Sequence, residues 1–183
     1  MRVITGQAGG RKLKAPKGMD TRPTSDRIKE SLFNIIGQRI IDSTFLDLYA
    51  GTGAIGIEAI SRGVLKAVFV ENNPRAIKII RDNLNSTGLA DMAEVISREV
   101  DIAIQTLSKC PRKFDIIFLD PPYLRDLVQK SLVTLDKNKI LATEGLVIAE
   151  SSKLDTLPEK AGSLEMLRQE KYGDTILSFY QQS

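Results

Sequence analysis

The sequence FLDLYAGTGAIG, residues 45 to 56, decides the fold. It begins as an apolar run typical of a buried strand and ends in a glycine pattern at Gly51, Gly53 and Gly56. Glycine lets the backbone turn tightly and approach a ligand closely, and the helix that follows begins with unpaired N–H groups. The stretch predicts a strand, a turn and a helix. Such a turn serves dinucleotides as well as adenosyl groups, or no ligand at all.

Strand-like and helix-like segments alternate along the rest of the chain. Near-continuous apolar strands joined by helices predict a parallel sheet covered on both faces. A first helix is expected from Thr24 or Ser25 to about Ile36. The expected strands are 44–49, 66–71, 93–97, 114–119 and 145–150, and the other expected helices are 54–62, 74–87, 100–108 and 124–136.

The two ends of the chain differ from this alternation. Runs 2–5 and 11–15 predict a basic β-hairpin, and runs 164–171 and 175–180 predict an antiparallel hairpin. The expected fold class is α/β, with a doubly wound, mostly parallel seven-stranded sheet and a hairpin at each end. We expect a single domain over 1–183, in which 1–23 form the hairpin extension and 24–183 the core.

Composition excludes several kinds of chemistry. A chain of 183 residues can bury enough surface to need no disulfide or metal. Cys110 is the only cysteine, which excludes an intramolecular disulfide and fits a reducing cytosol. Histidine is absent, so a Ser-His pair and a histidine metal site are excluded. Since no apolar run suits a signal peptide or membrane span, we expect a cytoplasmic protein.

Basic charge is concentrated near the N-terminus. Residues 1–29 carry eight basic and two acidic side chains, a net charge of +6, whereas the whole chain has +3. The remaining residues are therefore net acidic. A basic segment beside a site for a planar group is typical of phosphate contacts, which position a nucleic acid without reading its sequence. The alternative is a solvated, mobile arm.

Carboxylates lie at or shortly after the ends of two expected strands. In open α/β sheets, ligands bind beyond the carboxyl ends of the strands. Glu71 ends the second strand, where its carboxylate can accept hydrogen bonds from both ribose hydroxyls of an adenosine-containing ligand. Asp101 follows the third strand and could accept from an adenine amino group. The alternatives are a solvated strand-end glutamate and a first-turn acid stabilised by its helix dipole.

The tetrapeptide Asp120-Pro121-Pro122-Tyr123 follows the apolar run 116–119 and is the most informative motif. The Asp120 carboxylate and the Pro121 carbonyl can accept from the two N–H groups of an exocyclic amine and orient its nitrogen toward a methyl donor. The prolines stiffen the loop and remove competing N–H donors. Tyr123 can stack on an unpaired or flipped ring. This indicates an amino-group methyltransferase; the alternative is a proline turn with a surface tyrosine.

Other functions explain less of the sequence. A nucleotide-dependent oxidoreductase gives the tetrapeptide no role, and a non-catalytic RNA-binding module leaves the glycine turn unused. A C5-cytosine methyltransferase needs a cysteine nucleophile, but Cys110 lies far from the tetrapeptide. A protein glutamine methyltransferase usually has asparagine first in its tetrapeptide and does not require the basic segment. The closest alternative is methylation of another nucleic-acid amine, such as adenine N6 in RNA or DNA.

Four segments together resemble the RsmD family of bacterial methyltransferases: RPTSDRIKESLFN (22–34), FLDLYAGTGAIGIEAISRG (45–63), FVE (69–71) and FDIIFLDPPY (114–123). The resemblance spans nearly the whole chain, and its RPT-x-DR segment is the most specific part. Tyr49 departs from the usual phenylalanine, and Asn72-Asn73 stand where an acidic residue is frequent. The resemblance implies a class I fold that transfers methyl from S-adenosylmethionine to the exocyclic N2 of a guanine in 16S ribosomal RNA.

The resemblance also implies roles for individual residues. Asp120 to Tyr123 would be catalytic. The cofactor would be bound by Asp47, Tyr49, Ala50, Gly51, Thr52, Gly53, Glu71, Asn72, Asp101 and Asp120. The RNA would be bound by Arg2, Arg11 and Lys12 of the hairpin and by Arg22, Pro23, Thr24 and Arg27, although Thr24 could merely cap its helix and Arg27 bind a carboxylate. The expected partner is 16S ribosomal RNA in an assembled or assembling small subunit, with the protein a monomer that uses no metal.

Overall fold

The computed structural model describes residues 1–15, 26–122 and 126–183. Over these residues the chain forms one eight-stranded sheet with strand order β3-β2-β1-β4-β5-β8-β7-β6. The strands are β1 (Thr44–Leu48), β2 (Lys66–Glu71), β3 (Ala93–Ser97), β4 (Phe114–Leu119), β5 (Leu141–Ser152), β6 (Lys160–Ala161), β7 (Leu164–Tyr172) and β8 (Thr175–Gln182). The helices are α1 (Asp26–Ile36), α2 (Ala54–Ser61), α3 (Pro74–Thr87), α4 (Val100–Leu107) and α5 (Leu127–Asn138), with 3₁₀ turns η1 (Gly37–Ile40) and η2 (Ala90–Met92).

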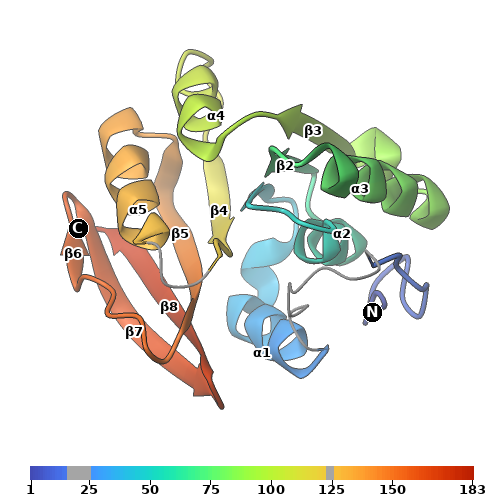
Figure 1. Ribbon diagram of the computed structural model, residues 1–183, viewed down its shortest axis with the longest axis horizontal. Coiled ribbons are helices and arrows are strands. Elements are labelled where there is room, and N and C mark those ends of the chain that lie inside the picture. The colour runs from blue at the N-terminus through green and yellow to red at the C-terminus, as the bar shows by residue number, and fades with distance from the viewer. Residues whose placement is uncertain (16–25, 123–125) are drawn as a thin grey trace.

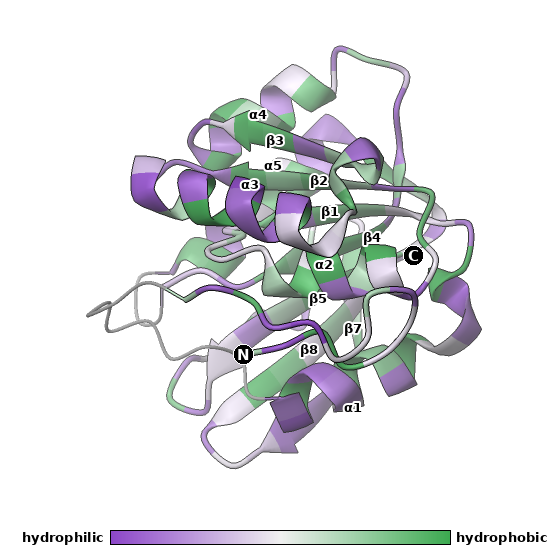
Figure 2. Cartoon of the chain, turned by 90° about the vertical axis from the view of Figure 1, so that its right-hand side faces the viewer, coloured by the Kyte–Doolittle hydropathy of each residue, from purple (hydrophilic) through white to green (hydrophobic). Residues whose placement is uncertain are grey.

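Helices cover both faces of the sheet (Figure 1). Apolar residues of α1, α2 and α3 share one buried cluster with one sheet face, and those of α4 and α5 share a second cluster with the other face. Along β1, Phe45 belongs to the first cluster and Leu46 to the second. Because neither face meets water, the central strands are continuous apolar runs. Figure 2 shows these strands mainly in the hydrophobic colour, whereas α3 carries a hydrophilic outer surface.

The predicted fold class is confirmed. Strands β1 to β5 pair in parallel, and β7 and β8 form the expected antiparallel hairpin. After β3, at the sheet edge, the chain returns to the centre and places β4 beside β1. The switch in strand order therefore lies between β1 and β4, and ligands of open α/β sheets bind beyond the carboxyl ends of strands at such a switch. The glycine turn and the Asp120 tetrapeptide follow these two strands.

Three details of the sheet and helices differ from the sequence prediction. The described residues form eight strands rather than seven, because the two-residue strand β6 pairs with β7. Strand β5 begins at Leu141, since an irregularity around Glu144 (φ 61°) lets Leu141 pair with Phe114 before the regular register resumes. Helix α5 begins at Leu127, after residues 123–125, which lie outside the described residues.

The N-terminal segment 1–15 is not the regular β-hairpin predicted. Arg2 and Lys12 form an isolated antiparallel bridge. Between them the chain bonds to α2 instead of to itself: the Gln7 N–H donates to the Ser61 carbonyl (2.9 Å) and the Ala8 N–H to the Ser61 hydroxyl (3.0 Å). Regular pairing therefore stops after one bridge. Three side chains of the segment are buried in the cluster shared with α1, α2 and α3: Val3, Ala8 and Leu13.

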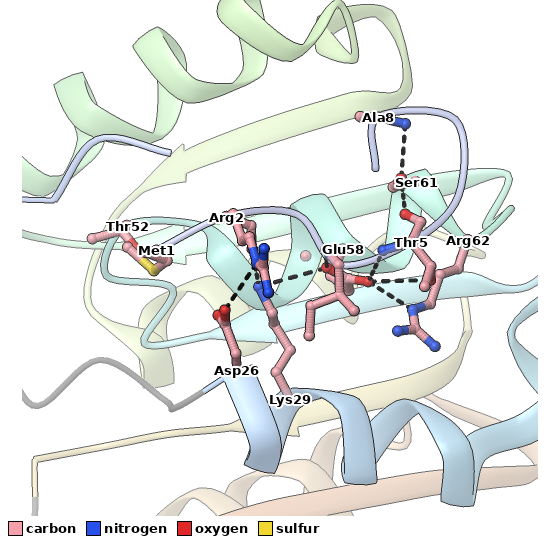
Figure 3. A network of polar contacts seen from close by, with 12 residues as sticks. Met1, Arg2, Thr5, Ala8, Asp26, Lys29, Thr52, Glu58, Ser61 and Arg62 are labelled. Carbon is pink, nitrogen blue, oxygen red and sulfur yellow. Dashed lines mark hydrogen bonds and ion pairs between the residues drawn. The ribbon is translucent and has the colours of Figure 1, made fainter. Parts of the chain in front are cut away.

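A buried polar network joins this segment to α1 and α2 (Figure 3). The fully buried Glu58 carboxylate accepts from the backbone N–H groups of Ile4 (2.7 Å) and Thr5 (3.1 Å). It also pairs with Lys29 of α1 (3.5 Å) and with Arg62 (2.8 Å). Burial lowers the pKa of Lys29, and the charge of Glu58 opposes this effect. The first 15 residues are thus tied to the core through a charged centre rather than forming a free arm.

None of the helices in the described part of the chain combines the length and apolar character needed to cross a bilayer. Within the same residues, no group of three or more acidic or cysteine side chains is arranged to hold a metal ion.

Candidate active site

The turn after β1 lies at the switch in strand order. Tyr49, Gly51 and Gly53 adopt left-handed conformations, with φ of 63°, 57° and 76°. Glycine adopts this conformation freely, whereas a tyrosine there is strained. Gly53 is the N-cap of α2, so that helix begins at this edge of the sheet. The Ala50 N–H donates to the Val70 carbonyl (3.0 Å), which ties the turn to β2.

The third glycine of the pattern packs α2 against β2. The Gly56 N–H donates to the buried Asp47 carboxylate (2.9 Å). A Cβ atom at Gly56 would overlap the ring of Phe69. The absence of a side chain therefore sets how closely the helix approaches the strand, and with it the shape of the turn.

We expect Gly56→Ala to lower the free energy of unfolding by about 1–3 kcal/mol, because an added methyl group in a packed core forces neighbouring groups to move. Urea denaturation followed by circular dichroism measures this loss. Phe69→Leu removes the ring that the methyl group meets. The double variant should therefore be more stable than the sum of the two single losses predicts, and losses that simply add would contradict the proposed contact.

Glu71 is held in place by backbone N–H groups. One carboxylate oxygen accepts from Gly51 (2.9 Å), and the other accepts from Asn72 and Asn73 (2.9 Å each). The Asn72 side chain donates to Glu99 (2.6 Å), and Asn73 caps α3. The Glu71 carboxylate therefore bonds directly to the glycine turn, and its predicted contact with ribose hydroxyls stays a prediction.

Tyr49 and Asp101 approach the same side of the sheet from different elements. The Tyr49 hydroxyl lies 2.9 Å from the Ser131 hydroxyl of α5. Burial raises the pKa of Tyr49, and the negative charges of Asp101 and Glu99 raise it further. The exposed Asp101 carboxylate accepts from the Thr134 hydroxyl (3.2 Å). The structure thus brings Asp101 close enough to Tyr49 for its charge to act on the phenol.

Strand pairing brings Glu71 and Asp120 to the same level of the sheet edge. Leu48 of β1 pairs with Val70 of β2 and with Leu119 of β4. Glu71 and Asp120 are the residues that follow Val70 and Leu119. The Asp120 N–H donates to the Leu48 carbonyl (3.4 Å). The glycine turn, which follows Leu48, therefore emerges between the two carboxylates.

Burial raises the pKa of two acids at this edge. The pKa of Asp47 rises to about 7, mainly through burial and also through the charge of Glu71, although the Gly56 N–H opposes the shift. The pKa of the half-buried Asp120 lies well above its usual value, first through burial and then through the charges of Glu150 and Asp47. A ligand that donates N–H groups to Asp120 would stabilise its ionised form.

A small pocket lies on the other side of Asp120 from the glycine turn. It is lined by Pro121 and Pro122, by the start of α5, by Glu150 of β5 and by the loop after β5. Pro121 is buried and Pro122 is exposed. The order of strands thus separates two regions at one edge, with the glycine turn and Glu71 on the β2 side of Asp120 and the pocket on its β5 side.

The predicted RNA-binding residues are only partly described. Arg2 makes an exposed ion pair with Asp26 (3.2 Å), and the Arg11 guanidinium donates to the Ser86 carbonyl of α3 (2.9 Å). Lys12 and Arg27 are exposed. Their contact with RNA stays a prediction. Four predicted site residues lie outside the described residues: Arg22, Pro23, Thr24 and Tyr123.

Sequence reasoning missed Asn83, which links the N-terminal segment to the glycine turn. Its fully buried side-chain oxygen accepts from the Lys14 N–H (2.8 Å), and its amide donates to the carbonyls of Lys14 (3.2 Å) and Thr52 (3.0 Å). The sequence signal that could have identified Asn83 is its position as a polar residue on the apolar stripe of α3. Glu58, Lys29 and Glu150 were missed for the same reason, since each is buried among apolar residues.

Comparison with known proteins assigns the chain to a family. The sequence profile described as "Conserved hypothetical protein 95" matches residues 1–181. "Putative rRNA methyltransferase YlbH" of Bacillus subtilis (strain 168) is 41% identical over 180 residues, which are 98% of each chain. "Ribosomal RNA small subunit methyltransferase D" of Escherichia coli (strain K12) is 34% identical over 181 residues, 99% of this chain and 89% of that protein.

The chain belongs to the RsmD family. The resemblance inferred from the four sequence segments is thereby confirmed. The same fold is seen in the solved structure of "Putative methyltransferase yhhF from Escherichia coli", which is 34% identical and superposes with a TM-score of 0.86. The match covers 100% of this chain and 98% of that one. The solved structure of "SMU.776, a putative methyltransferase complexed with SAH" shares the fold alone at 17% identity and a TM-score of 0.69, covering 84% of this chain and 48% of its own.

Proposed function

We propose that this chain transfers a methyl group from S-adenosylmethionine to the exocyclic N2 of a guanine in small-subunit ribosomal RNA. The relatives named as ribosomal RNA methyltransferases support the substrate. The observation that carries the proposal is the position of Asp120. It lies level with Glu71 across the glycine turn, at the switch in strand order of an RsmD-family fold.

The residues on the β2 side of Asp120 fit an adenosyl cofactor. A carboxylate has about four acceptor positions, so Glu71 can accept from a ribose hydroxyl while it keeps its three backbone N–H donors. The glycine turn allows close approach of the backbone, and the exposed Asp101 can accept from an adenine amino group. When bound, S-adenosylmethionine supplies an electrophilic methyl group. Its use by this chain is further supported by the fold shared with the putative methyltransferase complexed with SAH.

Asp120 and Pro121 would act on the amine. The Asp120 carboxylate and the Pro121 carbonyl accept from its two N–H groups, which fixes the direction of the nitrogen lone pair. The carboxylate can also hold the proton that the amine releases on methylation. This is catalysis by placement and electrostatics, and it needs no histidine. Tyr123, which lies outside the described residues, would stack on the base.

Transfer of labelled methyl from S-adenosylmethionine to ribosomal RNA tests the proposal. The RNA is offered free and in assembled small subunits, and the modified base is then mapped. We expect label on the N2 of a guanine. Label on an adenine, or on protein alone, would refute the substrate, and the ratio of free RNA to subunit labelling identifies the form that is modified.

Arg11 and Lys12 provide a test of the RNA contact. Replacing both with alanine should weaken RNA binding and flatten its dependence on salt, because each phosphate contact contributes a slope of roughly −0.7 to −0.9 in log affinity against log salt. If both side chains contact phosphate, the double variant should therefore lose about 1.4 to 1.8 of that slope. Cofactor affinity should not change. Fluorescence anisotropy at several salt concentrations measures how RNA affinity depends on salt, and calorimetry measures the affinity for the cofactor.

The matched control removes two exposed charges from the opposite edge of the sheet. Arg39 lies before β1 and Lys109 before β4, at the amino ends of these strands. Arg39→Ala/Lys109→Ala should leave the salt slope close to that of the unchanged protein. An equal slope for both double variants would show that the N-terminal segment does not contact phosphate.

A further inference from the structure

Glu150 lies beside Asp120 on the neighbouring strand. Leu119 of β4 pairs with Ala149 of β5, so the residues that follow them, Asp120 and Glu150, lie at the same level. Side chains alternate along a strand, and Phe118 and Ile148 both belong to the cluster on the α1 and α2 side of the sheet. Two residues further along, Asp120 and Glu150 therefore project from that same face.

Glu150 is buried yet lines the pocket next to Asp120. Its relative exposure is 3%, and it shares the pocket with Pro121 and Pro122. After burial, the charge of Glu150 contributes to the raised pKa of Asp120, so the two carboxylates are close enough for one charge to act on the other. A carboxylate offers about four acceptor positions, so it can bond within the protein and also accept a hydrogen bond from a ligand.

Two neighbouring acceptors suit guanine better than adenine. The Watson–Crick edge of guanine presents the N2 amine and, beside it, the N1–H, so both adjacent groups are donors. In adenine the N6 amine stands beside N1, which is an acceptor. A carboxylate next to the one that holds the amine would gain a hydrogen bond from guanine, whereas it would face a lone pair of adenine.

We propose that Glu150 determines specificity: its carboxylate accepts a hydrogen bond from the N1–H of the target guanine while Asp120 and Pro121 hold the N2 amine. This inference rests on the proposed function and deepens it by naming the residue that reads guanine. Glu150 lies on the β5 side of Asp120, away from the glycine turn and Glu71. A change at Glu150 should therefore alter which base is methylated without lowering the affinity for the cofactor.

The test uses 2-aminopurine, which keeps the reactive 2-amino group but has no hydrogen on N1. Ribosomal RNA is prepared with either guanosine or 2-aminopurine at the mapped target position, and initial rates of methyl transfer give the ratio of kcat/KM values. The unchanged protein should favour guanine by about 100-fold or more, since a site built to hydrogen-bond a substrate N–H rejects analogues that lack it. Glu150→Gln places an amide N–H donor opposite N1 and should reduce that ratio at least about tenfold.

Controls separate this effect from general damage. Glu144→Gln changes an exposed carboxylate on the same strand and should leave the ratio unchanged. Cofactor affinity by calorimetry reports whether the Glu150→Gln variant is folded. If the Glu150→Gln variant does not bind cofactor, Glu150→Asp is tested instead, because it withdraws the carboxylate by one methylene. This variant should also reduce the ratio of kcat/KM values for guanine over 2-aminopurine.

The outcomes distinguish the two proposals. If the unchanged protein methylates adenine or protein instead of guanine, the proposed function fails. If it methylates guanine N2 but the folded Glu150 variant keeps the same ratio within about twofold, the role of Glu150 is overturned while the proposed function stands. If the unchanged protein methylates 2-aminopurine and guanine at equal rates, the proposed role of Glu150 is also overturned.

Discussion

Asp120→Ala should abolish methyl transfer to RNA, with a loss in kcat of about a thousandfold or more, while affinity for S-adenosylmethionine stays within a few-fold. Removing one preorganised group that acts on developing charge costs about 10² to 10³ in rate, and Asp120 would also position the amine. Its carboxylate lies at the end of β4, one strand away from the turn that begins after Leu48 of β1. Single-turnover rates and cofactor calorimetry measure the two quantities separately.

Asp120→Asn is the matched control. An amide keeps one acceptor oxygen in place of the carboxylate, so this variant should retain more activity than Asp120→Ala. Equal losses in the two variants would argue that the charge, rather than the acceptor position, carries the effect. Loss of cofactor binding in a folded Asp120→Ala protein would refute the separation of the amine site from the cofactor site.

The raised pKa of Asp120 gives this prediction a pH dependence. Burial and the charges of Glu150 and Asp47 hold that pKa well above its usual value. The ionised carboxylate is the stronger acceptor for the amine, so kcat/KM of the unchanged protein should fall as the pH is lowered through the raised pKa. Asp120→Asn has no carboxyl group to titrate and should lose that limb of the profile. If the acidic limb of the kcat/KM profile persists unchanged in Asp120→Asn, a group other than Asp120 titrates there.

Glu58→Ala should lower the free energy of unfolding by about 3–5 kcal/mol, which is a large share of the roughly 5–15 kcal/mol typical of a domain. The substitution leaves Lys29 buried without its carboxylate and removes the acceptor for the N–H groups of Ile4 and Thr5. Urea denaturation measures the loss. Amide hydrogen exchange at Ile4 and Thr5 should also become faster, because the N-terminal segment loses its anchor.

Two further variants keep this test informative if Glu58→Ala does not fold. Glu58→Gln retains an acceptor for one backbone N–H and should lose less stability. Lys29→Met removes the buried cation, so Lys29→Met combined with Glu58→Gln should cost less than the sum of the single changes. Additive losses, with exchange at Ile4 and Thr5 unchanged, would mean that the ion pair does not hold the segment.

Much of the candidate site was predictable because local patterns encode it. Apolar runs separated by helical segments predicted the parallel strands, whose bounds agree closely with the observed β1 to β4. Gly51 and Gly53 occupy left-handed positions that glycine favours. Glu71 and Asp120 were recognised because Glu71 ends one such strand and Asp120 follows another, and in a parallel sheet the carboxyl ends of neighbouring strands meet at one edge.

The N-terminal hairpin shows where local patterns stop being sufficient. Two short β-like runs separated by glycines favour a hairpin, yet the chain between Arg2 and Lys12 bonds to Ser61 on α2. Packing against α2 is more stable than a regular hairpin, because a buried helix surface supplies both apolar contacts and polar partners. A lone two-stranded hairpin is only marginally stable in water.

The sequence by itself determined the order of strands and helices, the glycine turn, the two acidic strand ends and the family. Only the tertiary structure decided which distant groups come together. The Glu58 side chain bonds to the backbone of the first residues, and that of Asn83 bonds to the Thr52 carbonyl. Strand pairing places Glu150 level with Asp120. These polar residues lie on apolar stripes, where a hydropathy pattern treats them as exceptions. Their partners depend on how the strands are ordered within the sheet and on their register, which are set by long-range packing rather than by any local spacing of residues.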